Sequence, residues 1–129
     1  MSGFVTSRDV NVNATVLASA ARTATTTSDT FTNLHSRRAH LIIDVTVAPG
    51  VDTVTPKIEG YDAVSGKFYT LLTGSAISTT GTNVIKIGPG LAASANVSAA
   101  DFLPLKWRVT MTHSAGTSFT YSVAVNTGI

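Results

Sequence analysis

The stretch Leu41-Ile42-Ile43-Asp44-Val45-Thr46-Val47 alternates with a period of two. Its odd-numbered residues are all apolar, whereas its even-numbered residues include Asp44 and Thr46. This spacing is typical of a β-strand that buries one face. The stretches Lys106–Met111 and Phe119–Val125 alternate in the same way, and they are rich in the β-branched and aromatic residues that suit a pleated, half-buried surface. The sequence therefore predicts a β-sheet protein. The residues expected at the centre of its core are Trp107, Val109, Phe119, Tyr121, Ile43 and Val45.

Weaker alternation predicts further strands between and before these three stretches. The regions concerned are Ala14–Thr27, Thr53–Tyr61, Lys67–Leu72 and Thr82–Ile87. In Lys67–Leu72 the alternation puts Phe68, Thr70 and Leu72 on one face and Tyr69 and Leu71 on the other. Pro56 cannot donate a hydrogen bond to a ladder, which predicts an edge or bulged strand at Thr53–Tyr61. Glu59 falls on the face of that strand that we expect to be exposed.

Turn residues separate the predicted strands. Asp62-Ala63-Val64-Ser65-Gly66 predicts a hairpin in which Asp62 accepts backbone hydrogen bonds and Gly66 takes a positive φ. The stretch 91–102 has no helical spacing, and we expect a loop with at most one helical turn.

The length of 129 residues corresponds to one domain. Charged residues make up 12% of the chain, about half the usual share, and the mean hydropathy is +0.26, which argues against disorder. The predicted fold class is all-β: a single-domain antiparallel β-sandwich of about eight strands, jelly-roll-like or immunoglobulin-like. Residues 14–129 would form this sandwich, and residues 1–13 an extended N-terminal arm.

Several classes of function lack the residues that they need. The chain has no cysteine, which excludes disulfides, zinc thiolate sites and a cysteine nucleophile. No Gly-x-Ser-x-Gly elbow accompanies the three histidines, and Gly88-Pro89-Gly90 lacks the lysine of a phosphate-binding loop. We therefore expect no enzyme activity, no cofactor and no metal. A net charge of +2 with a single dense basic patch, Arg37-Arg38-Ala39-His40, predicts no nucleic-acid partner, and the absence of a long apolar run predicts no membrane span.

Two regions are candidates for contact with a protein partner. Arg37 and Arg38 form the densest basic pair; they are either simply solvated or an anchor for acidic groups, which arginine binds bidentately. The arm is the second region, because an extended segment can reach a neighbouring chain. The predicted contact residues are Phe4, Val5, Arg8, Val10, Arg37 and Arg38. We expect a homo-oligomer, with a trimer or dimer preferred.

Motifs along most of the chain resemble those of small virion structural proteins of tailed bacteriophages. The stretches that carry the resemblance, between about residues 20 and 125, are Ala21-Arg22-Thr23-Ala24-Thr25-Thr26-Thr27, the Leu41–Val47 stretch, Lys57-Ile58-Glu59-Gly60-Tyr61-Asp62, Ser65-Gly66-Lys67-Phe68-Tyr69-Thr70-Leu71-Leu72, Trp107-Arg108-Val109-Thr110-Met111-Thr112-His113-Ser114 and Ser118-Phe119-Thr120-Tyr121-Ser122-Val123. The resemblance implies a virion component, without assigning its place in the virion, and it carries no catalytic or ligand residues.

The resulting hypothesis is a non-enzymatic decoration or cement protein that bridges major capsid subunits on the outside of a phage head. It would be made in the host cytoplasm and end in the virion. A tail, fibre or head-fibre component is one alternative. A carbohydrate-binding adhesin domain that contacts the host surface is another.

Overall fold

The computed structural model describes residues 11–129, which fold into β-strands joined by turns and loops, without a helix. No described segment is therefore a helix able to cross a membrane. Seven strands are long and three have two residues. The bounds are β1 Val12–Arg22, β2 Thr26–Thr27, β3 Phe31–Thr32, β4 Arg38–Val47, β5 Val54–Asp62, β6 Lys67–Thr73, β7 Gly81–Ile87, β8 Ser98–Ala99, β9 Lys106–His113 and β10 Phe119–Gly128.

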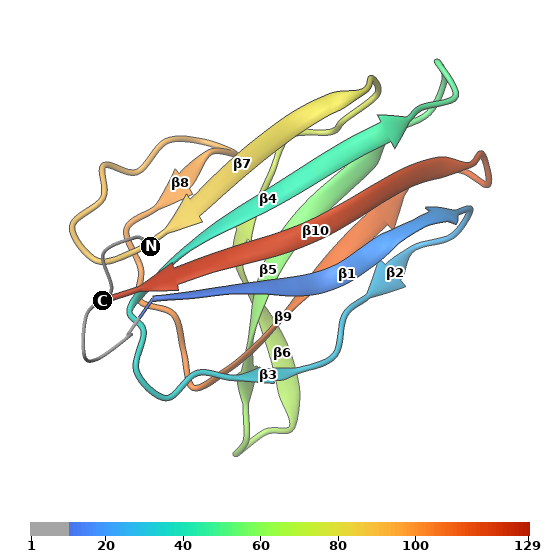
Figure 1. Ribbon diagram of the computed structural model, residues 1–129. Helices are drawn as coiled ribbons and strands as arrows, with labels where there is room; N and C mark the ends of the chain where they lie inside the picture. The colour runs from blue at the N-terminus through green and yellow to red at the C-terminus, as the bar shows by residue number, and fades with distance from the viewer. Residues whose placement is uncertain (1–10) are drawn as a thin grey trace, which may run out of the picture.

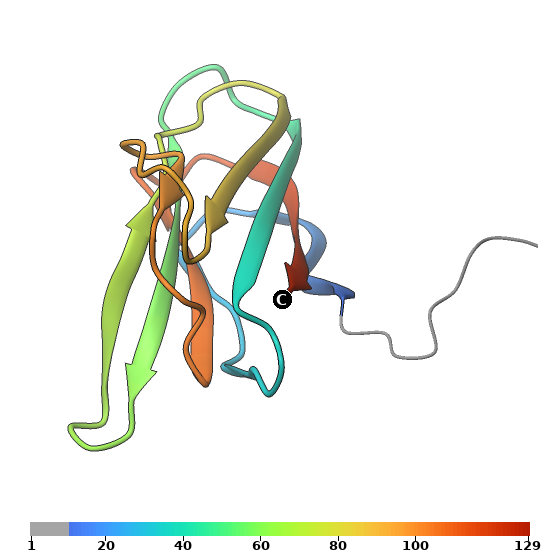
Figure 2. The ribbon, with the colours of Figure 1, turned by 90° about the vertical axis from the view of Figure 1, so that its left-hand side faces the viewer.

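The strands form two sheets that pack face to face as a sandwich (Figures 1 and 2). Sheet A has the order β1-β10-β4-β7-β8, and sheet B has the order β2-β9-β5-β6 with β3 also paired to β9. All pairs are antiparallel except β7 with β8. If β2 and β3 count as one interrupted strand and β8 is set aside, eight strands remain. Renumbered from one to eight in chain order, they have the sheet orders 1-8-3-6 and 2-7-4-5. This is the strand order of a jelly roll, and it decides between the two predicted sandwich types.

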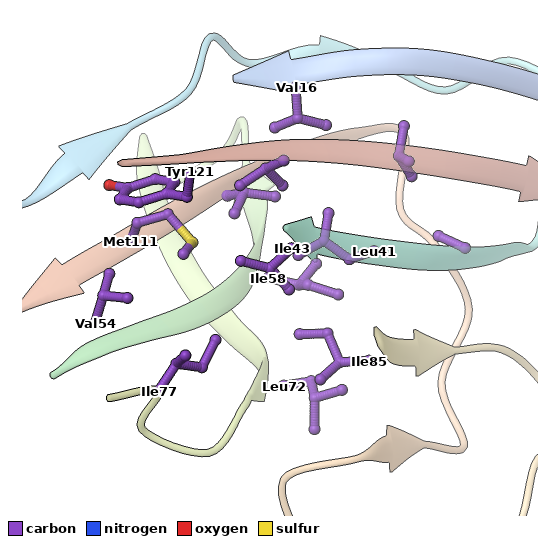
Figure 3. Close-up of a cluster of buried hydrophobic side chains, with 14 of the residues drawn as sticks. Val16, Leu41, Ile43, Val54, Ile58, Leu72, Ile77, Ile85, Met111 and Tyr121 are labelled. Atoms are coloured by element: carbon purple, nitrogen blue, oxygen red, sulfur yellow. The ribbon is translucent and has the colours of Figure 1, made fainter. Parts of the chain in front are cut away.

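The core lies between the sheets and comes from the inward-facing residues of each strand (Figure 3). All six residues predicted for its centre are at most 4% exposed. In β4 the predicted alternation holds for Leu41, Ile43 and Val45, which are buried while the residues between them face outwards. Val47, predicted on the same buried face, is 55% exposed, because it lies at the end of the strand. The period-two pattern is therefore the physical cause of the sandwich, since each sheet can cover its apolar face only with the other.

Of the two alternatives predicted at Thr53–Tyr61, an edge or a bulged strand, the edge strand is wrong, because β5 lies between β9 and β6. Pro56 is tolerated there because its backbone nitrogen and carbonyl point towards β6 rather than β9. At that level β6 has already ended, since its last residue is Thr73. The Pro56 carbonyl accepts a hydrogen bond from Gly74 N (2.8 Å), and the missing N–H has no strand opposite it. A register shift does occur in the β5–β6 pair, between Ile58 and Glu59, where Leu71 is the extra residue on β6.

The N-terminal boundary of the sandwich lies slightly earlier than predicted. Val12 and Asn13 belong to β1 and pair with Thr127 and Asn126 of β10, so these two residues of the expected arm are part of sheet A. The other residues expected in the arm are outside the described residues, except Asn11. The region 14–27 supplies two strands, one in each sheet, and the stretch 91–102 is a loop that contains β8.

Candidate interaction surface

One end of the sandwich joins the start of β4 to the C-terminus and to the loop before β9. The side chain of Asn33 ties two loops together: its Nδ2 donates to the carbonyls of Ser36 (2.7 Å) and Leu103 (2.9 Å), and its Oδ1 accepts from Ser36 N (2.9 Å). Arg37 adds two backbone hydrogen bonds, from its N to Gly128 O (2.8 Å) and to its O from Leu103 N (3.1 Å). We call this region the terminal end; it comprises residues 11–13, 33–40, 101–106 and 126–129. Figure 1 shows the C-terminus lying beside the starts of β1 and β4.

The two predicted arginines lie at the terminal end, and both are exposed. The aliphatic part of Arg38 crosses Gly88, where an added Cβ would lie 2.7 Å from Arg38 Cγ. Neither guanidinium forms a side-chain hydrogen bond or an ion pair with another residue of the described part of the chain. Both are therefore available to a partner. Phe4, Val5, Arg8 and Val10 lie outside the described residues.

A groove of about 420 Å³ runs along the outer face of sheet A at this end, and Arg38 and His40 line it. The strand register places Asn13, Asn126, His40 and Lys86 in one row across β1, β10, β4 and β7. The Asn13 and Asn126 side chains are hydrogen-bonded to each other. The row thus offers amide groups and the ammonium of Lys86, and the Arg38 guanidinium lines the same groove, which suits a carboxylate-bearing partner.

Exposed apolar side chains gather at the same end. Leu34 is 72% exposed and Phe102 61%, and Val12, Leu105 and Ile129 are also more than half exposed. Sequence reasoning missed this group because four of its members lie outside the strands and follow no period. Monomeric proteins keep exposed apolar patches small, so these side chains make the terminal end a candidate contact surface.

The outer face of sheet B holds a polar cluster around Glu59 whose members are hydrogen-bonded or ion-paired to one another. Glu59, predicted to be exposed, is only 6% exposed. It accepts hydrogen bonds from Thr110 Oγ1 (2.6 Å) and Arg108 Nε (3.0 Å), and Lys57 Nζ lies 3.4 Å away. Burial raises the pKa of Glu59, but the hydrogen bonds from Thr110 and Arg108 and the charges of Lys57 and Arg108 outweigh it, so the pKa is below its ordinary value.

The aromatic side chains of this face are already occupied by neighbours. The Arg108 guanidinium lies 3.4 Å from the Phe68 ring centroid, and Tyr61 packs against Phe68 with the centroids 4.8 Å apart. Tyr69 follows Phe68 on β6 and therefore points to the opposite face, where it lies across Gly60. These side chains therefore do not form the open aromatic row on which a sugar would stack.

The side chain of His113 packs against two aromatic residues of β10. His113 Nε2 is hydrogen-bonded to Tyr121 Oη (2.9 Å), and its ring packs edge-on against Phe119. Its Nδ1 is buried without a partner in residues 11–129. Burial, followed by the charge of Arg22, lowers the pKa of His113. No group of three or more histidine, aspartate or glutamate side chains in the described part could hold a metal ion.

The comparisons with known proteins point to a shared fold. No family model matches the chain, and no curated protein matches it either. The structure is similar to the SPBc2 prophage-derived protein YomS, with a TM-score of 0.52 and 14% identity, over 98% of this chain and 100% of YomS. A more distant similarity links it to a chain of the infectious bursal disease virus Gx strain, with a TM-score of 0.44 and 12% identity, over 91% of this chain and 31% of the viral chain. At such identities the likeness to YomS shows the fold, and the more distant viral match adds no argument to it.

Proposed function

We propose that this chain is a non-enzymatic structural protein of a bacteriophage virion, and more specifically a decoration protein that binds the outer capsid surface and bridges major capsid subunits. The jelly-roll fold is compatible with this role but is used by proteins of many functions. The similarity to a prophage-derived protein along the whole of both chains supports a phage context. So do the sequence motifs that resemble small phage virion proteins.

The observation that carries the proposal is the terminal end. It combines Arg37 and Arg38, whose side chains have no partner in residues 11–129, with exposed Leu34, Phe102 and Leu105. Arginine and aromatic residues are enriched in protein–protein interfaces, where apolar side chains form the centre and charges the rim. A capsid protein or a second copy of this chain fits that surface, and Phe4, Val5, Arg8 and Val10 would extend it from residues outside the described part.

The charges of the arginines offer a direct test. The double variant Arg37→Glu with Arg38→Glu reverses both charges at the terminal end and should reduce binding to capsids that lack the protein. The control is Lys67→Glu, which reverses an exposed charge on β6, away from the terminal end. Full binding by the double variant would contradict the proposed surface.

The number of copies in the virion tests the role itself. Stained gels of purified virions should show the chain at hundreds of copies, comparable with the major capsid protein. A few copies would indicate a tail or fibre component instead. Binding of the isolated protein to a glycan array would favour the alternative of an adhesin. The rings of Phe68 and Tyr61 already contact neighbouring side chains, which disfavours sugar stacking on them.

A further inference from the structure

An apolar cleft opens between the two sheets along the side formed by β1 and β3. Its volume is about 330 Å³, and its apolar lining residues include Val12, Val16, Phe31, Leu34, Trp107 and Val125. It exists because the edge of sheet B on this side consists only of the two-residue strands β2 and β3, whereas β1 on the facing sheet has eleven residues. Part of the inner face of β1 therefore has no strand opposite it.

The geometry points to an occupant for this cleft: we propose that it holds the chain's own N-terminal segment, residues 1–10, with Phe4 as the anchor. This inference concerns the free protein and goes beyond the proposed function. The first strand residue, Val12, lies on the rim of the cleft and is half exposed. The segment before it thus begins at the opening.

The reach and the composition of the segment fit the cleft. Eight residue steps separate Phe4 from Val12, and at about 3.3 Å for each step an extended chain spans about 26 Å, enough to return to any part of the cleft. Phe4, Val5 and Val10 are apolar and suit walls formed by Phe31 and Trp107, whose rings pack with their centroids 5.1 Å apart.

The tether favours the same chain over a second copy. A segment joined to the rim by a few residues has an effective concentration on the order of millimolar, far above that of a separate copy in dilute solution. The consequence for assembly is direct: apolar residues proposed to contact the capsid are sheltered in the free protein, and a partner has to displace them.

Disulfide trapping tests the proposal, and it is clean because the chain has no cysteine of its own. Gly3→Cys places a thiol beside Phe4, and Leu34→Cys places one on the exposed rim of the cleft. The matched control pairs Gly3→Cys with Val84→Cys, on the outer face of sheet A. We expect the cleft pair to form an intramolecular disulfide about tenfold faster than the control pair. This ratio corresponds to a tenfold preference of the segment for the cleft over the outer face of sheet A. Adding Phe4→Ala should remove that advantage.

Equal disulfide rates in the two pairs would overturn the proposal, and so would a cleft pair whose rate Phe4→Ala leaves unchanged. Covalent dimers whose yield rises with protein concentration would also overturn it, because the occupant would then be a second copy. Since only the free protein is measured, failure here leaves the proposed capsid function standing.

Discussion

Arg22 and Tyr121 contact each other through both backbone and ring. Arg22 Nη1 donates to the backbone carbonyl of Tyr121 (2.8 Å), and the guanidinium carbon lies 4.7 Å from the centroid of the Tyr121 ring. Arg22 Nη2 also donates to the carbonyl of Ala18 (2.5 Å). The register between β1 and β10 shifts between Leu17 and Ala20, so one arginine satisfies carbonyls that the interrupted ladder leaves free.

Replacing Arg22 by lysine should destabilise the protein by about 2 kcal/mol, because one ammonium cannot hold two separated carbonyls and stack on Tyr121 together. Chemical denaturation monitored by circular dichroism measures the change. Arg37→Lys, at an exposed arginine without side-chain contacts in the described residues, is the control and should change stability by less than about 0.5 kcal/mol. Equal effects of the two substitutions would show that the Arg22 contacts contribute nothing.

Period-two patterning predicted the strands well, because burial on one face imposes it. The core residues of β4, β9 and β10 could be read from the sequence for that reason. Glu59 shows the limit of the method: its position on the outer face was correct, but its exposure was not. Side chains of neighbouring strands cover an outward residue in the middle of a sheet, and only the strand order reveals that Arg108 and Thr110 are those neighbours.

The predicted face of β6 fails for a related reason. Simple alternation put Phe68, Thr70 and Leu72 on one face. The extra residue at Leu71 reverses the alternation, so Leu72 is buried while Phe68 contacts Arg108 on the outer face of sheet B.

The candidate interaction surface could be predicted only at its charged residues, Arg37 and Arg38. The hairpin prediction, by contrast, rests on local chemistry and is confirmed: Asp62 accepts hydrogen bonds from Val64 N and Ser65 N, and Gly66 has φ +72°.

Two glycines should respond differently to an added methyl group. A Cβ on Gly74 would lie 2.7 Å from Cγ of the buried Pro56 ring, which cannot rotate away. Gly74→Ala should therefore cost about 2 kcal/mol, as overpacking does. A Cβ on Gly60 would meet the tip of Tyr69, which is 43% exposed and can swing outwards, so Gly60→Ala should cost less.

A double-mutant cycle checks that explanation. If Tyr69 is the obstacle, the cost of Gly60→Ala disappears in the Tyr69→Ala background, while the cost of Gly74→Ala stays the same there. An unchanged cost of Gly60→Ala without the Tyr69 ring would contradict the argument.

The Glu59 cluster should be sensitive to the loss of Arg108. Arg108→Ala removes a hydrogen bond to a buried carboxylate and should cost about 2 kcal/mol. Lys57→Ala removes a longer contact of a partly exposed ammonium and should cost less than about 1 kcal/mol.

The Glu59 carboxylate should also make stability depend on pH. Because the pKa of Glu59 is lowered in the folded protein, its contribution to the free energy of unfolding is present above its ordinary pKa of 4.5 and is lost as the pH falls through the folded pKa. Urea titrations between neutral and acidic pH should show a smaller loss for Glu59→Gln than for the unmodified protein.

His113 should give the sandwich a second, milder sensitivity to acid. Burial and the charge of Arg22 lower its pKa from 6.5, so the fold favours the neutral ring, which is hydrogen-bonded to Tyr121 Oη. The stabilisation that this preference confers is complete above pH 6.5 and declines as the pH falls towards the folded pKa, because the unfolded chain then binds the proton more readily. Thermal unfolding followed between pH 7.5 and 5.5 should therefore show a midpoint that falls, and His113→Gln should flatten that part of the profile. Arg22→Gln should raise the pKa of His113, measured by the NMR titration of its ring, because it removes the charge that opposes protonation. A His113 pKa at or above 6.5 in the unmodified protein would contradict both the burial and the charge argument.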